Sequence, residues 1–133
     1  MSARCDAIVT SAYWDSSGVV KLLVEESGWE IAVETWNGAE RNIASRLVVA
    51  EVSAALAAAR RAARLDEEAD RDARSRWARY QRAIEFVELT PAVGAHAADL
   101  AVEHDLSGAD AVHLASALTL RQAELIVLTW DRR

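Results

Sequence analysis

The sequence predicts an α/β protein in which helices flank a central parallel sheet of short strands. Apolar, β-compatible runs alternate along the chain with helical patterns, and the order strand, helical crossover, strand is typical of a parallel sheet. The 133 residues include one Pro and five Gly, and no linker-like or low-complexity stretch divides them. A single domain is expected, because domains cluster at about 100–150 residues.

Each strand is predicted from a short apolar or alternating run bounded by turn residues. The four runs are 8–14, 42–45, 86–90 and 125–129. The first alternates loosely and ends at Asp15-Ser16-Ser17-Gly18, which is a turn or helix-cap signal. The third is bounded by Pro91. The fourth is continuously apolar, which is typical of a strand buried on both faces.

The helices are predicted from apolar residues that recur every three or four positions. The six segments are 19–24, 28–36, 46–63, 67–85, 92–105 and 107–122. Asn37-Gly38 predicts a turn after the second segment. Asp66 is a candidate cap for the fourth segment, which is very polar. The last segment is apolar almost all round, so we expect it to lie centrally.

Composition and charge exclude several classes of protein. The net charge of −6 argues against a sequence-indifferent nucleic-acid coat, although an enzyme that holds nucleic acid through metal ions remains compatible. The sequence has no Gly-rich phosphate loop, which excludes P-loop and dinucleotide-binding proteins. Cys5 is the only cysteine, the N-terminus does not resemble a signal peptide, and no apolar stretch is long enough to cross a membrane. A cytoplasmic protein without a membrane partner is therefore expected.

Four carboxylates stand where an α/β protein places its site. Ligands bind outside the carboxyl ends of the strands, and Asp15 and Asp131 directly follow the first and last predicted strands. Glu51 lies on or beside the apolar stripe of its helix, and Asp110 opens the central helix. Converging carboxylates repel one another unless a cation lies between them, and oxygen ligands alone select a hard cation such as Mg²⁺ or Mn²⁺.

Each of these residues also has a purely structural interpretation. Glu51 can lie at the edge of the stripe and reach water. Asp110 can complete a Ser-x-x-Asp arrangement that resembles a capping box. Asp15 or Ser16 can be a helix cap, and Asp131 a solvated turn residue.

Four motifs in this order resemble those of PIN-domain proteins, and especially of the VapC toxins of bacterial toxin–antitoxin pairs. The first motif is DSSGVVKLL at 15–23, and the second is AEV around Glu51. The third, GADAVHLASA at 108–117, is the most specific because ten consecutive positions fit. The fourth is TWD at 129–131. The resemblance covers nearly the whole chain and implies a PIN-like fold with four to five short strands.

The resemblance implies a Mg²⁺-dependent endoribonuclease in which Mn²⁺ can substitute. By this resemblance, Asp15 and Asp110 would be direct or water-mediated metal ligands. Glu51 would bind the metal through water or orient the attacking water, and Asp131 would complete the cluster or hold a second ion. The hydroxyls of Ser16 and Thr129 would support the ligands.

The resemblance also implies partners: an RNA substrate, a cognate VapB-type antitoxin and a second copy in a homodimer. The chain stops at Arg133, where the family usually continues with a short helix and often a final strand. Residues 1–133 are therefore expected to form a single domain whose C-terminal end is either truncated or shortened.

Some features leave alternatives open. The segment 60–82 carries eight Arg against five acidic residues, so it can steer RNA or simply form an exposed face with ion pairs such as Glu67–Arg71 or Asp70–Arg74. His113 is either a hydrogen-bonded core histidine or, less readily, a general base. The competing functions are another Mg²⁺-dependent phosphohydrolase and a non-catalytic interaction module with the same fold.

Overall fold

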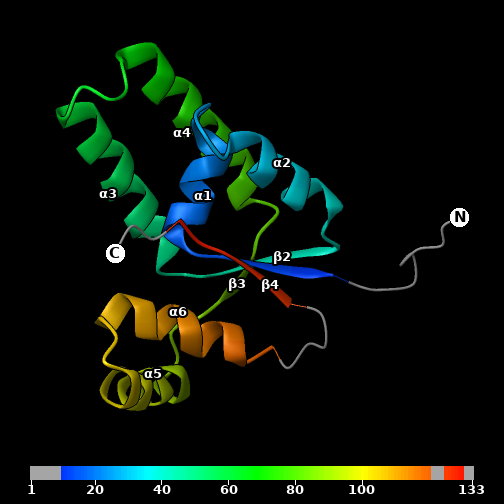
Figure 1. Ribbon diagram of the computed structural model, residues 1–133, viewed down its shortest axis with the longest axis vertical. Helices are drawn as coiled ribbons and strands as arrows, with labels where there is room; N and C mark the ends of the chain where they lie inside the picture. The colour runs from blue at the N-terminus through cyan, green and yellow to red at the C-terminus, as the bar shows by residue number, and fades with distance from the viewer. Residues whose placement is uncertain (1–9, 121–124, 131–133) are drawn as a thin grey trace, which may run out of the picture.

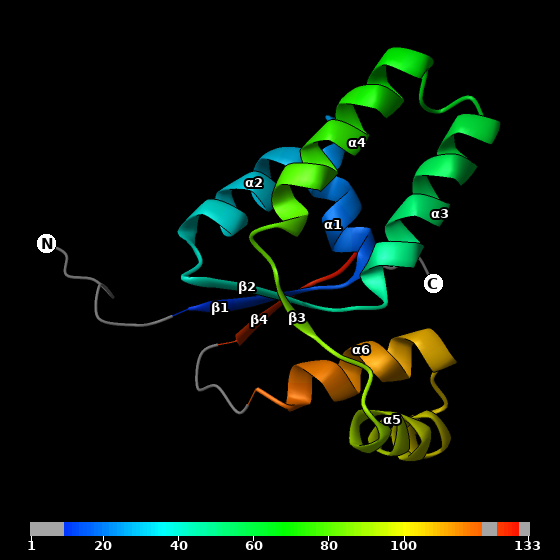
Figure 2. The ribbon, with the colours of Figure 1, turned by 180° about the vertical axis from the view of Figure 1, so that it is seen from behind.

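Four parallel strands in the order β3-β2-β1-β4 form a sheet through the middle of the molecule. The computed structural model describes residues 10–120 and 125–130. In chain order the elements are β1 (Ser11–Trp14), α1 (Ser16–Leu23), α2 (Trp29–Gly38), β2 (Arg41–Ser45), α3 (Val48–Arg61), α4 (Glu67–Gln81), β3 (Glu85–Val87), α5 (Pro91–His104), α6 (Gly108–Leu118) and β4 (Leu125–Leu128). Helices α1 to α4 cover one face of the sheet, and α5 and α6 cover the other (Figure 1; Figure 2). The predicted α/β class with a central parallel sheet is confirmed.

Strand β1 joins the two layers because its side chains alternate between the faces of the sheet. Ala12 and Trp14 are fully buried in the larger core, which includes residues of α1 to α4. Tyr13 is buried on the opposite face, where it packs with Ile43 of β2 and Ala117 of α6. The middle of β1 therefore contacts both helical layers.

Four helices begin with a side chain that caps a free backbone N–H group. The caps are Asp15 of α1, Asp66 of α4, Thr90 of α5 and Ser107 of α6. The prediction of an Asp66 cap is confirmed, and the Ser107 hydroxyl accepts from the backbone N–H of Asp110 at 3.1 Å. Such caps stabilise a helix by about 1 kcal/mol each, so they explain where these helices start.

The α3–α4 hairpin is buried unequally. Helix α3 buries one face at helical spacing, as predicted, with Val48, Val52 and Leu56 nearly inaccessible to solvent. Helix α4 buries only Ala73 and Trp77. The polar sequence of this helix therefore agrees with its exposure, because most of its surface faces water. Its Trp77 side chain packs in the core.

Strand β4 lies at the edge of the sheet, and the prediction that it is buried on both faces was wrong. It pairs with β1, and the side chains of Ile126 and Val127 remain 48% and 52% exposed. An apolar run does not distinguish a central strand from an edge strand, because an edge strand can also consist of apolar residues.

Several boundaries differ from the predicted ones by a few residues. Helix α1 starts at Ser16, immediately after its Asp15 cap, because the polar first turn carries no apolar signal. Helix α2 continues through Gly38, so the predicted Asn37-Gly38 turn is wrong. Helix α4 ends at Gln81, and α6 ends at Leu118. Strand β3 is only 85–87, shorter than predicted. None of the described helices is long and apolar enough to cross a bilayer.

Candidate active site

Helices α1, α3 and α6 all begin near the carboxyl ends of β1 and β2, although α6 covers the opposite face of the sheet from α1 and α3 (Figure 1; Figure 2). Asp15 caps α1, Glu51 lies in the first turn of α3, and Asp110 lies in the first turn of α6. All three side chains are therefore carried by helix N-termini, whose dipoles stabilise negative charge. The fourth predicted residue, Asp131, lies outside the described residues.

Asp15 is held by its own turn and by the segment after β4. Its Oδ1 accepts from the backbone N–H of Gly18 at 2.9 Å and from the hydroxyl of Ser17 at 2.8 Å. The Ser17 Oγ also accepts from the backbone N–H of Trp130 at 2.7 Å, and it lies 3.5 Å from the Thr129 Oγ1. A single hydroxyl thus ties the Asp15 carboxylate to the segment that leads to Asp131.

A close backbone contact reinforces this connection between α1 and β4. The backbone N–H of Asp15 donates to the Leu128 carbonyl at 3.2 Å. A Cβ on Gly18 would lie 2.5 Å from that same carbonyl oxygen, which is shorter than any ordinary contact. The glycine in the first motif is therefore required by the close approach of the strand, and its φ angle is not the reason.

Glu51 is held by side chains from other elements. Its Oε1 lies 2.7 Å from Nε2 of His113 on α6, and the Nδ1 of the same ring lies 2.8 Å from the Tyr13 hydroxyl. The Tyr13 and His113 side chains are buried, whereas the Glu51 side chain is 25% exposed. A continuous chain of hydrogen bonds thus runs from the core to the carboxylate. The structure supports the interpretation of His113 as a hydrogen-bonded buried residue.

The pKa of Tyr13 is raised well above its ordinary value, chiefly because burial disfavours the phenolate. The negative charges of Asp15 and Glu51 add to the shift. Tyr13 therefore stays a neutral phenol.

The described carboxylates suit a hard cation in their chemistry. Carboxylate oxygens are the ligands that Mg²⁺ and Mn²⁺ prefer, and no thiolate competes among them. Within residues 10–120 and 125–130, however, no three acidic, His or Cys side chains are grouped closely enough to hold a metal ion by themselves. The donor types therefore fit the implied metal, and the ligand set stays a prediction.

Sequence reasoning missed Ser17 and Tyr13. Ser16, predicted to support the ligands, is the first residue of α1, and the cap is Asp15, so its alternative role as a cap is wrong. Ser17 carries the contacts to Asp15 and Trp130. Its position two residues after a capping Asp was the available signal. The only sequence signal for Tyr13 was the loosely alternating apolar pattern of the segment that forms β1.

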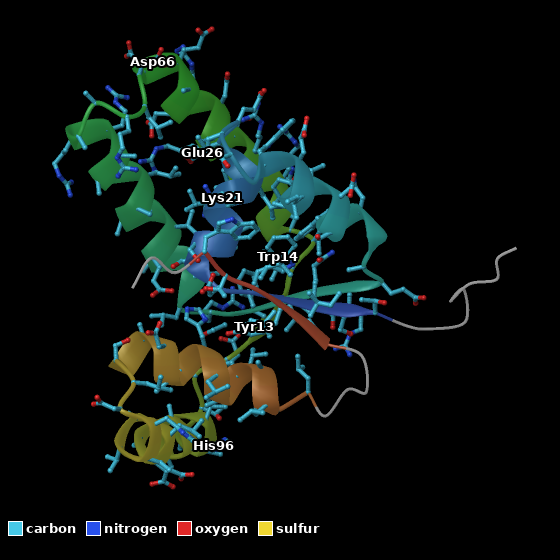
Figure 3. All side chains as sticks on the ribbon, viewed as in Figure 1. Tyr13, Trp14, Lys21, Glu26, Asp66 and His96 are labelled. Carbon is cyan, nitrogen blue, oxygen red and sulfur yellow. The ribbon has the colours of Figure 1, made fainter. Side chains whose placement is uncertain are left out.

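The α3–α4 hairpin contains one of the two ion pairs given as examples from its sequence. Asp70 contacts Arg74 at 3.1 Å, as predicted, and Arg60 at 3.5 Å, whereas no ion pair joins Glu67 to Arg71 in the part of the chain that the structure describes. Arg76 donates to the Leu23 carbonyl and pairs with Glu25. Figure 3 places Asp66, at the start of α4, far from Tyr13. This end of the hairpin is thus remote from the region of the site around Tyr13.

Comparison with known proteins identifies relatives of the chain. A family model described as PIN domain matches residues 12–133. Two proteins of Mycobacterium tuberculosis, Ribonuclease VapC45 and Ribonuclease VapC49, are each 48% identical over 121 residues, which cover 91% of this chain and 84% of each relative.

Solved structures of low sequence identity share the fold. VapC20 of Mycobacterium tuberculosis, described as a sarcin-ricin loop cleaving toxin, has a TM-score of 0.66 at 18% identity and covers 90% of this chain and 91% of its own. A toxin–antitoxin complex from Klebsiella pneumoniae has a TM-score of 0.62 at 21% identity, with 91% and 99% covered. VapBC2 of Rickettsia felis, bound to a promoter DNA fragment, has a TM-score of 0.60 at 12% identity, with 92% and 100% covered.

Proposed function

The chain belongs to the PIN-domain family, and on that premise we propose that it is a VapC-type toxin that cleaves RNA by metal-dependent hydrolysis. The observation that carries the proposal is the placement of Asp15, Glu51 and Asp110 at three helix N-termini near the carboxyl ends of the strands. The 48% identity to two named ribonucleases supports the same activity.

Mg²⁺ is the proposed cofactor, and Mn²⁺ is expected to replace it. A bound divalent ion lowers the pKa of a water ligand and neutralises charge on the phosphate that is attacked. Asp15 and Asp110 would hold the ion directly or through water, with Asp131 completing the set. Glu51 would bind the ion through water or orient the attacking water, and Ser17 and Thr129 would keep the Asp15 side of the site in place.

The partner proposals follow from the family and from the relatives' names. We propose a VapB-type antitoxin that blocks the site, an RNA substrate, and a homodimer as the working assembly. A cavity of about 770 Å³ between α1, α3 and α4 is lined by small and aliphatic residues, with Arg64, Arg76 and three acidic side chains among them. Its lining suits an amphipathic peptide segment, such as part of an antitoxin.

The proposal is tested by incubating the purified, antitoxin-free protein with total RNA and mapping the new 5′ ends. The reactions contain Mg²⁺ or Mn²⁺, or EDTA in place of metal, and a parallel set uses Asp110→Asn. Discrete cuts that disappear with EDTA and with the variant would support the proposal and identify the substrate. Full metal-dependent cleavage by Asp110→Asn would contradict the assignment of the site. Release of phosphate from small phosphomonoesters without RNA cleavage would favour a different phosphohydrolase.

A further inference from the structure

We propose that His113 is a positioning residue that fixes the orientation of the Glu51 carboxylate, and that Tyr13 holds the opposite end of the His113 ring while it does so. The proposal rests on the proposed function, since Glu51 belongs to the site described above. It gives a role to two buried residues of β1 and α6 that the proposed reaction does not use.

The hydrogen bond to Glu51 determines that Nε2 of His113 carries a proton. An ionised carboxylate can only accept hydrogen bonds, so at 2.7 Å from Glu51 Oε1 the Nε2 must carry a proton and donate it. A neutral imidazole with its proton on Nε2 has a lone pair on Nδ1. That lone pair faces the Tyr13 hydroxyl at 2.8 Å.

The Tyr13 proton is directed toward this lone pair. The phenol is buried, and its hydroxyl carries one proton that it can donate. This O–H therefore donates to Nδ1 of His113. With Nδ1 acting as the acceptor, the Nε2–H tautomer is the one that satisfies both neighbours, and the ring is held at both ends.

This arrangement restricts Glu51. A glutamate side chain loses up to about 2 kcal/mol of conformational entropy when it is ordered, so an exposed Glu on a helix surface would sample many rotamers. Here His113 holds Oε1, while a quarter of the side chain stays open to solvent. Oε2 is consequently the oxygen left to act in the site, at a position set by β1 and α6.

The tautomer is measured first, on the metal-free wild-type protein, by long-range ¹⁵N–¹H NMR of the histidine ring nitrogens. The spectra are recorded at pH 8. The expected result for His113 is a protonated Nε2 and an unprotonated Nδ1 that is locked in one form. His96, which is exposed on α5 and lies away from the sheet (Figure 3), provides the control and should average between tautomers. A protonated Nδ1 on a neutral His113 ring, or averaging like that of His96, would overturn the proposal.

A pair of near-isosteric variants then separates positioning from packing. In His113→Gln the side-chain amide can still donate to Glu51, whereas in His113→Asn it can reach only the place of Nδ1. We expect kcat to fall about 10–100-fold for the Asn variant, with KM little changed, and the Gln variant to restore much of the loss. His96→Asn should leave both constants unchanged. Equal kcat values for the Gln and Asn variants, with both proteins folded by circular dichroism, would contradict the positioning role.

Tyr13→Phe tests the other end of the chain of hydrogen bonds. It removes the donor to Nδ1, so the ¹⁵N shift of Nδ1 should move toward the value of a nitrogen without a hydrogen bond, while Nε2 keeps its proton for Glu51. Tyr80→Phe is the matched control, because Tyr80 packs edge-on against Trp36. An unchanged Nδ1 shift in Tyr13→Phe would overturn the role of Tyr13. A wild-type protein with no ribonuclease activity would instead overturn the proposed function, and the NMR result would still decide whether Tyr13 and His113 are connected as proposed.

Discussion

The two sides of the candidate site are held in different ways. Asp15 is positioned by groups two and three residues away in its own turn, and Ser17 extends this local unit to the end of β4. Glu51 is positioned by His113, 62 residues later in the chain, and through it by Tyr13, 100 residues before His113. One carboxylate thus depends on local backbone geometry, whereas the other depends on the packing of α3 and β1 against α6.

This difference teaches which parts of a site can be recognised in a sequence. A helix cap and its turn are adjacent in the chain, so a short sequence motif can reveal their function. A contact between distant residues leaves no such pattern, and only the fold brings its members together.

The largest expected effect separates the charge of Asp15 from its role as a helix cap. Asp15→Asn keeps the capping oxygen, and Asn caps a helix about as well as Asp, so the melting temperature should barely change. Ribonuclease activity should fall at least about 100-fold, because the loss of a metal-binding charge costs several kcal/mol. Asp99→Asn on the exposed side of α5 is the control. Activity within a few-fold of wild type would show that Asp15 is only a cap.

The second prediction tests the close approach of α1 to β4. Gly18→Ala would place a Cβ 2.5 Å from the Leu128 carbonyl oxygen, so it should destabilise the protein by about 1–3 kcal/mol. Gly94→Ala on α5 meets no atom within 4 Å and should instead stabilise by about 0.5–1 kcal/mol. Urea unfolding measures both. The same sign for the two variants would refute the tight contact on the Asp15 side.

A smaller effect is expected from the bridge between Asp15 and the end of β4. Ser17→Ala leaves the Trp130 N–H without its acceptor and should cost about 1–2 kcal/mol, together with part of the activity. Ser16→Ala, the neighbouring substitution, should be close to neutral. If Ser16→Ala proved the more damaging of the two in unfolding and cleavage assays, the sequence-based choice of Ser16 would be right.

The smallest effect is expected from the α3–α4 hairpin. Arg61→Gln combined with Arg71→Gln should change KM for RNA by less than about twofold at physiological salt, because exposed charges remote from the site are screened within about 8 Å. Cleavage rates measured over a series of salt concentrations provide the readout. A large rise in KM with a steeper salt dependence in the wild type would show that the hairpin binds RNA.

Much of the fold and part of the site could be predicted from the sequence. The layered α/β arrangement, the Asp66 cap and the Asp70–Arg74 pair follow from local patterns, and the structure contains them. The edge position of β4 could not be predicted, because an apolar run carries no information about its neighbours in the sheet. His113 was recognised as a buried, hydrogen-bonded residue, but its partners Tyr13 and Glu51 were not, since all three meet only after β1, α3 and α6 pack together.

The central claim is that Asp15, Glu51 and Asp110 form one metal site despite their different supports. Calorimetric titration of the antitoxin-free protein with Mn²⁺ tests it most directly, using Asp15→Asn, Glu51→Gln, Asp110→Asn and the control Asp99→Asn. The account predicts that the wild type and the control bind equally well, and that each of the three site variants weakens binding by about tenfold or more. Wild-type affinity in all three site variants, or no measurable binding by the wild type, would contradict it.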